Sequence, residues 1–190
     1  MKPSSLNREE WMEKLVAIDT SLVSQGATAQ LLIIGSAIGI LAGQPGRTSG
    51  DLDVWKPKSR YQFQALKRAV EQAGLAFDPK STLEPDQPYL QFIEPGIAEL
   101  GSFDEAETLE QFQALRLERP PIANVVAAKL IRCDPRDLED IAFLMARYRP
   151  ASEDIAKAIQ SMPKAAREQA AENMVYLRTL SGNQSEDSCP

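Results

Sequence analysis

Two aspartates one residue apart carry the clearest chemical signal in this sequence. They lie in the stretch Asp51-Leu52-Asp53-Val54, where acidic and apolar residues alternate. A period of two predicts a strand with both acids on one side and both apolar side chains on the other. Two carboxylates this close repel each other unless a cation lies between them. Hard oxygen ligands suit Mg²⁺, which binds one or two carboxylates together with substrate phosphates. The pattern therefore indicates phosphate chemistry; the alternative is that Asp51 and Asp53 are turn and surface acids at the start of a strand.

A turn that suits a phosphate lies a short distance upstream. The apolar run 31–34 ends in Gly35-Ser36, where a strand is expected to meet a helix. Glycine lets a phosphate approach the backbone closely, and the start of a helix offers N–H groups and a positive dipole. The alternative is an ordinary strand-to-helix turn in which Ser36 is the N-cap.

Two basic residues have more than one interpretation. Arg47, followed by Thr48, precedes the two acids; it can pair with one of them, reach a phosphate, or remain a solvated loop arginine. Lys129 lies in the middle of an apolar helical stripe. A lysine there must extend to solvent, pair with an acid or contact a ligand. Further along, Asp134 is expected to cap a helix, and Asp137 to turn inward toward Arg132 or Lys129.

Composition excludes several classes of function. The chain has 190 residues, 43% of them hydrophobic, a net charge of -6 and no histidine. The lack of histidine excludes Ser-His and Cys-His catalysis and histidine zinc sites. The acidic balance argues against a general nucleic-acid coat, although four residues near the acids can form a local positive rim. These are Arg47, Lys56, Lys58 and Arg60.

Cysteine content and hydropathy point to a cellular compartment. The two cysteines are far apart and do not suggest a disulfide framework. The apolar runs are much shorter than the roughly 20 residues of a membrane span, and the chain begins with a charged helix instead of a signal segment. We therefore expect a soluble cytoplasmic protein with no membrane partner.

The order of the expected elements defines a fold class. Helices are expected at 8–23, 36–41 and 59–73, and strands at 31–34, 51–55, 89–93, 97–100 and 112–117. Four helices follow, at 122–133, 135–148, 152–162 and 164–180. This order predicts an α+β fold with an α/β core, a mixed sheet flanked by helices and a C-terminal helical part. The expected division is a core over 1–120, a helical part over 121–182 packed on that core, and a disordered tail over 183–190.

Three segments together resemble the signature of the DNA polymerase β-like nucleotidyltransferase superfamily. They are Gly35-Ser36, Arg47-Thr48 and the strand 51–54. The segments 128–130 and 136–141 are similar to the second half of its AbiEii-type and minimal nucleotidyltransferase branch. That branch includes toxins of bacterial toxin–antitoxin and phage-defence systems.

The resemblance implies a magnesium-dependent enzyme that moves a nucleotide from an NTP to an acceptor hydroxyl in RNA, a protein or a small molecule. Asp51 and Asp53 would hold Mg²⁺ and support in-line phosphoryl displacement. A tRNA or protein acceptor and a cognate partner protein are the partners it implies. Five residues would contact the nucleotide: Gly35, Ser36, Arg47, Thr48 and Lys129.

One position departs from the family pattern. The resemblance implies a third acid in the strand 89–93, but Gln91 occupies its place. An amide cannot act as a base and is a poorer ligand for a hard cation. Glu94 and Glu99 are nearby candidates. The alternative is a catalytically degenerate protein of the same fold that binds nucleotide or another protein. A third interpretation is an interaction protein whose helices after residue 121 pair with another chain.

Overall fold

Strands and helices alternate through the first 120 residues, and only helices follow. The computed structural model describes residues 5–79 and 87–177. The chain divides into two compact units, which are described separately. The first contains residues 1–97 and 105–120, and the second, the helical unit, contains residues 98–104 and 121–190. The α+β class, with a mixed sheet arrangement and a helical C-terminal part, is confirmed.

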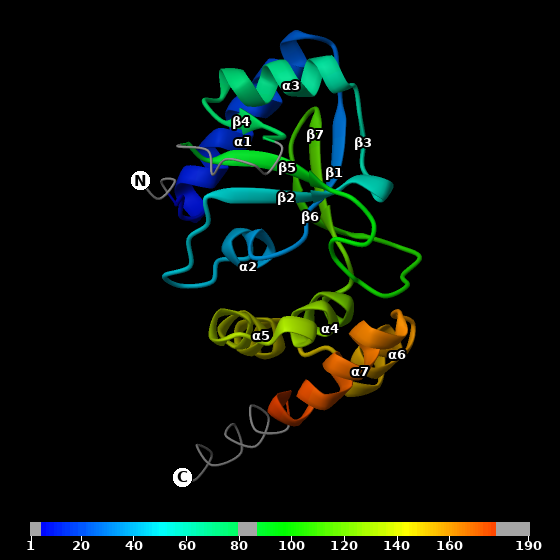
Figure 1. Cartoon of the computed structure of the whole chain (residues 1–190). Coiled ribbons are helices and arrows are strands. Elements are labelled where there is room, and N and C mark those ends of the chain that lie inside the picture. The colour runs from blue at the N-terminus through cyan, green and yellow to red at the C-terminus, as the bar shows by residue number, and fades with distance from the viewer. Residues whose placement is uncertain (1–4, 80–86, 178–190) are drawn as a thin grey trace. The chain divides into compact units, whose positions relative to one another are not determined.

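The first unit holds two sheets (Figure 1). One has the strand order β3-β1-β7-β6, with β1 parallel to β7 and the other pairs antiparallel. The other has the order β2-β5-β4, with all strands parallel. The strands are β1 (Ala29–Leu32), β2 (Asp51–Trp55), β3 (Arg60–Tyr61), β4 (Ala76–Phe77), β5 (Tyr89–Ile93), β6 (Glu107–Gln111) and β7 (Leu115–Arg119).

A short link joins the two sheets directly after β1. Ile33 forms an isolated antiparallel bridge with Val54 of β2, and the Ile34 N–H donates to the Asp53 carbonyl at 2.9 Å. Ile33 and Val54 are fully buried, so apolar packing supports the link. As a result the end of β1 lies against the acidic strand.

Helices complete the first unit. These are α1 (Arg8–Ser24), α2 (Ala37–Leu41) and α3 (Phe63–Gln72), with a 3₁₀ turn η1 (Lys56–Lys58). α1 begins with a capping box between Asn7 and Glu10. It packs against α3, and its buried residues follow a helical spacing. The largest are Trp11, Leu15, Ile18 and Leu22.

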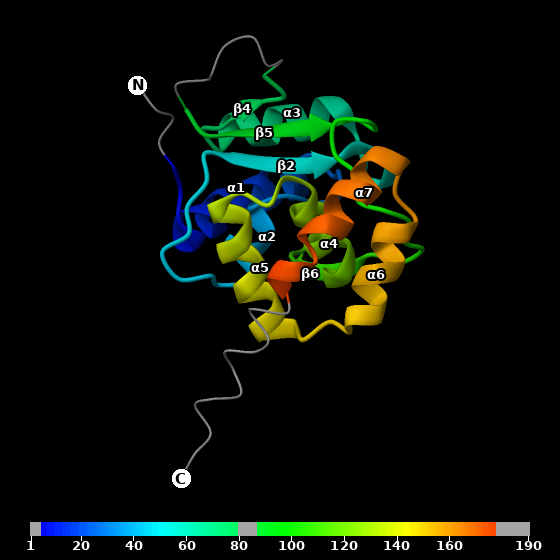
Figure 2. The same ribbon diagram turned by 60° about the horizontal axis from the view of Figure 1, so that its bottom comes forward.

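The helical unit is built around α4 (Figure 2). It comprises α4 (Ile122–Arg132), α5 (Pro135–Tyr148), α6 (Ser152–Gln160) and α7 (Lys164–Asn173), and α4 contacts each of the others. Asn124 of α4 is buried and donates its amide hydrogens to the carbonyls of Leu100 at 2.9 Å and Ser102 at 3.1 Å. These bonds tie the segment 98–104 to the helices.

Three expectations about local structure were wrong. The helix expected from residue 59 begins at Phe63, because residues 60–61 pair with β1 as β3. Phe63, expected on the buried face of that helix, is 51% exposed. The strand expected at 97–100 does not form: residues 96–97 make a turn and Leu100 belongs to the helical unit.

Two expected strands also differ, and two ranges cannot be compared. The strand expected at 31–34 forms earlier, as β1 (Ala29–Leu32). The strand expected at 112–117 is replaced by the antiparallel pair β6 and β7. The tail 183–190 and the end of the last expected helix, from residue 178, lie outside the described residues. Within the part of the chain that is described, no helix has the length and apolar character needed to cross a membrane.

Candidate functional site

β2 presents its two aspartates on one side of the second sheet. Asp51 and Asp53 are half-exposed, whereas Leu52 and Val54 between and after them are 0% exposed. The alternation predicted from the sequence is therefore confirmed as structure. The two carboxylates share one partly solvated surface, and that is the arrangement a hard cation requires.

Gly35 brings backbone close to the second of these acids. The bond from Ile34 to the Asp53 carbonyl fixes the approach, and Gly35 adopts a left-handed φ of 71°. A Cβ atom at Gly35 would lie only 2.9 Å from Asp53 Oδ2. Both the backbone conformation and the space therefore demand glycine.

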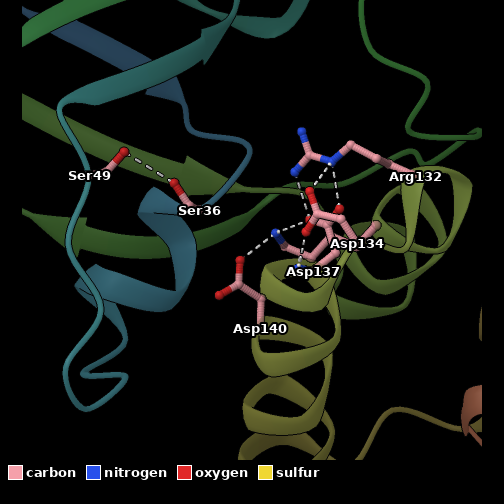
Figure 3. A network of polar contacts seen from close by, with 7 residues as sticks. Ser36, Ser49, Arg132, Asp134, Asp137 and Asp140 are labelled. Carbon is pink, nitrogen blue, oxygen red and sulfur yellow. Dashed lines mark hydrogen bonds and ion pairs between the residues drawn. The ribbon is translucent and has the colours of Figure 1, made fainter. Parts of the chain in front are cut away.

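A chain of hydroxyl groups connects the Gly-Ser turn to the first acid, and Figure 3 shows its first bond, between Ser36 and Ser49. Ser36 Oγ donates to Ser49 Oγ at 3.3 Å, and Ser49 Oγ in turn donates to Asp51 Oδ1. Ser36 occupies the N-cap position of α2, as the N-cap alternative predicted, but its side chain makes no capping hydrogen bond to the helix. Ser36 instead acts on Asp51 through Ser49.

Ser49 is a functional candidate that the sequence reasoning missed. Ser49 is 9% exposed, and hydrogen bonds fix both its N–H and its carbonyl. Its backbone exchanges two hydrogen bonds with Leu6, and its carbonyl also accepts the Trp11 indole N–H at 3.3 Å. The sole sequence signal was a serine two residues before Asp51; the partners on the N-terminal segment and α1 are far away in the chain.

Gln91 lies directly beside Asp53 in the sheet. β2 and β5 are parallel with Asp53 opposite Gln91, and Gln91 Nε2 donates to Asp53 Oδ1 at 2.6 Å. The amide therefore lies where the resemblance implied an acid. Glu94 is exposed and forms an ion pair with Lys56, which raises the pKa of Lys56, and Glu99 belongs to the helical unit.

The remaining loop residues lie between α2 and β2 or just after β2. Arg47 is half-buried and Thr48 is exposed in the loop that leads to Asp51. Lys58 and Arg60 are exposed on η1 and β3. The nucleotide contacts expected of Arg47 and Thr48 stay predictions.

Lys129 occurs in the other unit and is engaged there. Its ammonium lies 2.6 Å from Asp140 Oδ2 and 3.3 Å from Asp137 Oδ1. Arg132 also binds Asp137, through Nε at 2.7 Å and a second nitrogen at 3.0 Å (Figure 3). Asp137 therefore turns inward to both Arg132 and Lys129. The nucleotide contact expected of Lys129 stays a prediction.

Asp134 caps the helix that carries these acids. Its carboxylate accepts the backbone N–H of Asp137 at 2.9 Å, as expected for an N-cap. This hydrogen bond is the main reason that the pKa of Asp134 lies below its ordinary value, with the positive charge of Arg132 adding to the effect. A different hydrogen bond, from the Arg132 guanidinium to the Asp137 carboxylate, raises the pKa of Arg132.

The donor set around Asp51 and Asp53 fits a divalent cation of the hard class. Two carboxylates and the Ser49 hydroxyl offer oxygen atoms, and Mg²⁺ typically fills its remaining positions with water and substrate phosphate. Among residues 5–79 and 87–177, no group of three or more His, Cys, Asp or Glu side chains is arranged to hold a metal. A metal at this site would take its remaining ligands from water and substrate phosphate.

Comparisons with known proteins bear on the fold. No family model matches this chain, and no curated protein matches its sequence. Among solved structures, it is similar to the crystal structure of an antigenic nucleotidyltransferase-like protein from Paracoccidioides brasiliensis, with a TM-score of 0.53 and 14% sequence identity. The likeness covers 94% of each chain. The chain therefore has a nucleotidyltransferase-like fold.

Proposed function

We propose that this protein is a magnesium-dependent nucleotidyltransferase that moves a nucleotide from an NTP to an acceptor hydroxyl. One observation carries the proposal: Asp51 and Asp53 share a half-exposed side of β2, with the Gly35 backbone close against Asp53. A nucleotidyltransferase-like fold with paired acids at this position is best explained by metal and phosphate binding.

Each residue has a defined task in this proposal. Asp51 and Asp53 would bind Mg²⁺, which supplies charge neutralisation for the phosphates and for the leaving group. Ser49 orients Asp51 through its hydroxyl, and Gly35, which has no side chain, lets the backbone lie close against the Asp53 carboxylate. The Ser36 hydroxyl fixes Ser49 in turn.

The acceptor and the biological setting follow from the sequence resemblance. An RNA, a protein or a small molecule can supply the acceptor hydroxyl, and the exposed Lys58 and Arg60 would favour an anionic one. The resemblance to the AbiEii-type branch supports a component of a toxin–antitoxin or phage-defence system, with a cognate partner protein.

The first test measures binding. The melting temperature of the full chain is followed as Mg²⁺ and each NTP are added, for the wild type and for Asp51→Asn/Asp53→Asn. A metal-dependent rise that disappears in the double variant supports the site. Glu153→Gln/Asp154→Asn is the matched control, because it removes the same two charges from exposed positions on α6. No rise with any NTP contradicts the proposal.

A second test measures transfer. The protein is incubated with Mg²⁺, NTPs labelled at the α-phosphate and either total RNA or total protein. Label that enters one fraction with the wild type and not with the double variant identifies a nucleotidyltransferase and its acceptor class.

A specific observation favours a second candidate function. Gln91 donates to Asp53 and offers no carboxylate that can remove a proton from an acceptor hydroxyl. The second candidate is therefore a nucleotide-binding or interaction module of the same fold. As a nucleotide-binding module it predicts the Mg²⁺-dependent rise in melting temperature without label in either fraction and without release of pyrophosphate. As an interaction module it predicts no rise at all.

A further inference from the structure

We propose that Gln91 is a positioning residue that orients Asp53 and limits this site to one divalent cation. The inference rests on the proposed function, because it assumes that Asp51 and Asp53 bind a metal. It goes further by stating how many ions the site holds and which residue sets that number.

The position of Gln91 is fixed by the sheet. The parallel register pairs Asp51 with Tyr89 and Asp53 with Gln91, so Asp53 and Gln91 project from the same side. The hydrogen bond of 2.6 Å between them is charge-assisted, and such bonds are roughly twice as strong as neutral ones. Gln91 therefore holds Asp53 Oδ1 in one direction.

The other oxygen of Asp53 is placed by a different segment. Asp53 Oδ2 lies over Gly35, 2.9 Å from the position that a Cβ atom would take. The Asp53 carboxylate therefore lies between the Gln91 amide of β5 and the backbone of Gly35, which follows β1. Neighbours on two sides define its rotation, as a metal ligand requires.

The summed charge of Asp51 and Asp53 matches the charge of one divalent cation. Asp51 and Asp53 carry two negative charges, while Ser49 and Gln91 approach them with neutral donors. Two-metal sites hold their ions about 3.5–4 Å apart, and the four positive charges of two dications exceed the charge of two carboxylates. The group beside Asp53 is the Gln91 amide, which is neutral. Its N–H points at the Asp53 carboxylate, and this N–H group repels a second cation.

Substitution of Gln91 by glutamate tests this directly. Gln91→Glu keeps the size of the side chain and adds a third carboxylate next to Asp53. The expected result is a second Mn²⁺ per chain, because the added charge both repels Asp53 and attracts a cation. Gln91→Ala removes the hydrogen bond, and we expect it to weaken the binding of the single Mn²⁺ about tenfold or more.

The measurement is a Mn²⁺ titration of the full chain without nucleotide, followed by electron paramagnetic resonance of the free ion. It reports the number of ions bound and does not depend on turnover. Gln64→Glu is the matched control, since it adds the same charge at an exposed position of α3. Melting temperatures without metal establish that each variant folds, and Gln91→Asp replaces Gln91→Glu if that variant does not.

The outcomes separate this inference from the proposed function. One Mn²⁺ in the wild type and two in the carboxylate variant support it. Two Mn²⁺ in the wild type, both lost in Asp53→Asn, overturn the inference and leave the proposed function intact. The same holds if the Gln91 variants bind Mn²⁺ as the wild type does. No Mn²⁺ and no nucleotide binding overturn both.

Discussion

The ammonium of Lys129 lies 2.6 Å from the carboxylate of Asp140, with the two side chains 9% and 1% exposed. Asp137, 3% exposed, adds a second carboxylate at 3.3 Å, and Arg132 binds both oxygens of that carboxylate. Two buried acids are thus balanced by one buried lysine and one largely exposed arginine. This pairing explains how a lysine is tolerated on the apolar stripe of α4.

We predict that Lys129→Met strongly destabilises the protein. The substitution leaves Asp137 and Asp140 buried without their shared counter-charge, and the loss of one partner of a buried pair costs about 3–5 kcal/mol. Urea unfolding monitored by circular dichroism measures the change. Lys157→Met is the matched control: Lys157 is 77% exposed in its pair with Asp154, and such pairs contribute about 0–1 kcal/mol.

A further variant separates loss of charge from loss of packing. Lys129→Met/Asp140→Asn also removes the charge of the carboxylate that lay 2.6 Å from the lost ammonium, so we expect it to recover part of the stability lost in the single variant. If Lys129→Met costs no more than Lys157→Met, the buried network does not stabilise the helical unit.

We predict that Gly35→Ala abolishes binding of the Mg²⁺–NTP pair. The added Cβ would lie 2.9 Å from Asp53 Oδ2 and displace that carboxylate. The left-handed backbone adds a cost of about 1–2 kcal/mol to folding. The melting-temperature shift with Mg²⁺ and NTP measures binding, and urea unfolding measures stability.

Gly26→Ala is the control for the folding cost of placing alanine in a left-handed backbone conformation. Gly26 has a similar φ of 61°, and a Cβ there would meet nothing within 4 Å. Its alanine variant is expected to lose similar backbone stability and to keep the nucleotide-dependent shift. Equal nucleotide binding by both variants would argue against a close approach of ligand and metal at Gly35.

We predict that Asp134 makes stability depend on pH in the acid range. Its hydrogen bond to the Asp137 N–H lowers its pKa in the folded state relative to the unfolded value of about 3.9. The stability from this group is therefore fully present above that value and is lost as the pH falls through the lower folded pKa.

Two variants of Asp134 test this. Asp134→Asn keeps a capping oxygen without a titrating group, so its difference in unfolding free energy from the wild type should shrink as the pH falls from 6 to below about 3.9. Asp134→Ala should cost about 1 kcal/mol at neutral pH because the cap is lost. A difference between wild type and Asp134→Asn that stays constant across this range would contradict the assignment.

The sequence by itself determined the features that depend on neighbouring residues. The alternation in 51–54 set which side of β2 carries the acids, and the cap at Asp134 set where α5 begins, because strand pleating and helix capping involve only a few adjacent positions. The α+β class also followed from the order of these local patterns. The apolar stripe of α4 showed that Lys129 needed a partner, but several partners satisfied the pattern equally.

Only the tertiary structure decided which distant residues meet. Gln91 became the neighbour of Asp53 through the register of β2 and β5, and Gly35 reached Asp53 through the bridge between Ile33 and Val54. Residues 60–61 became a strand because β1 offered an edge, against their helical pattern. These pairings are fixed by hydrogen bonds and burial between segments far apart in the chain, and no local period encodes them.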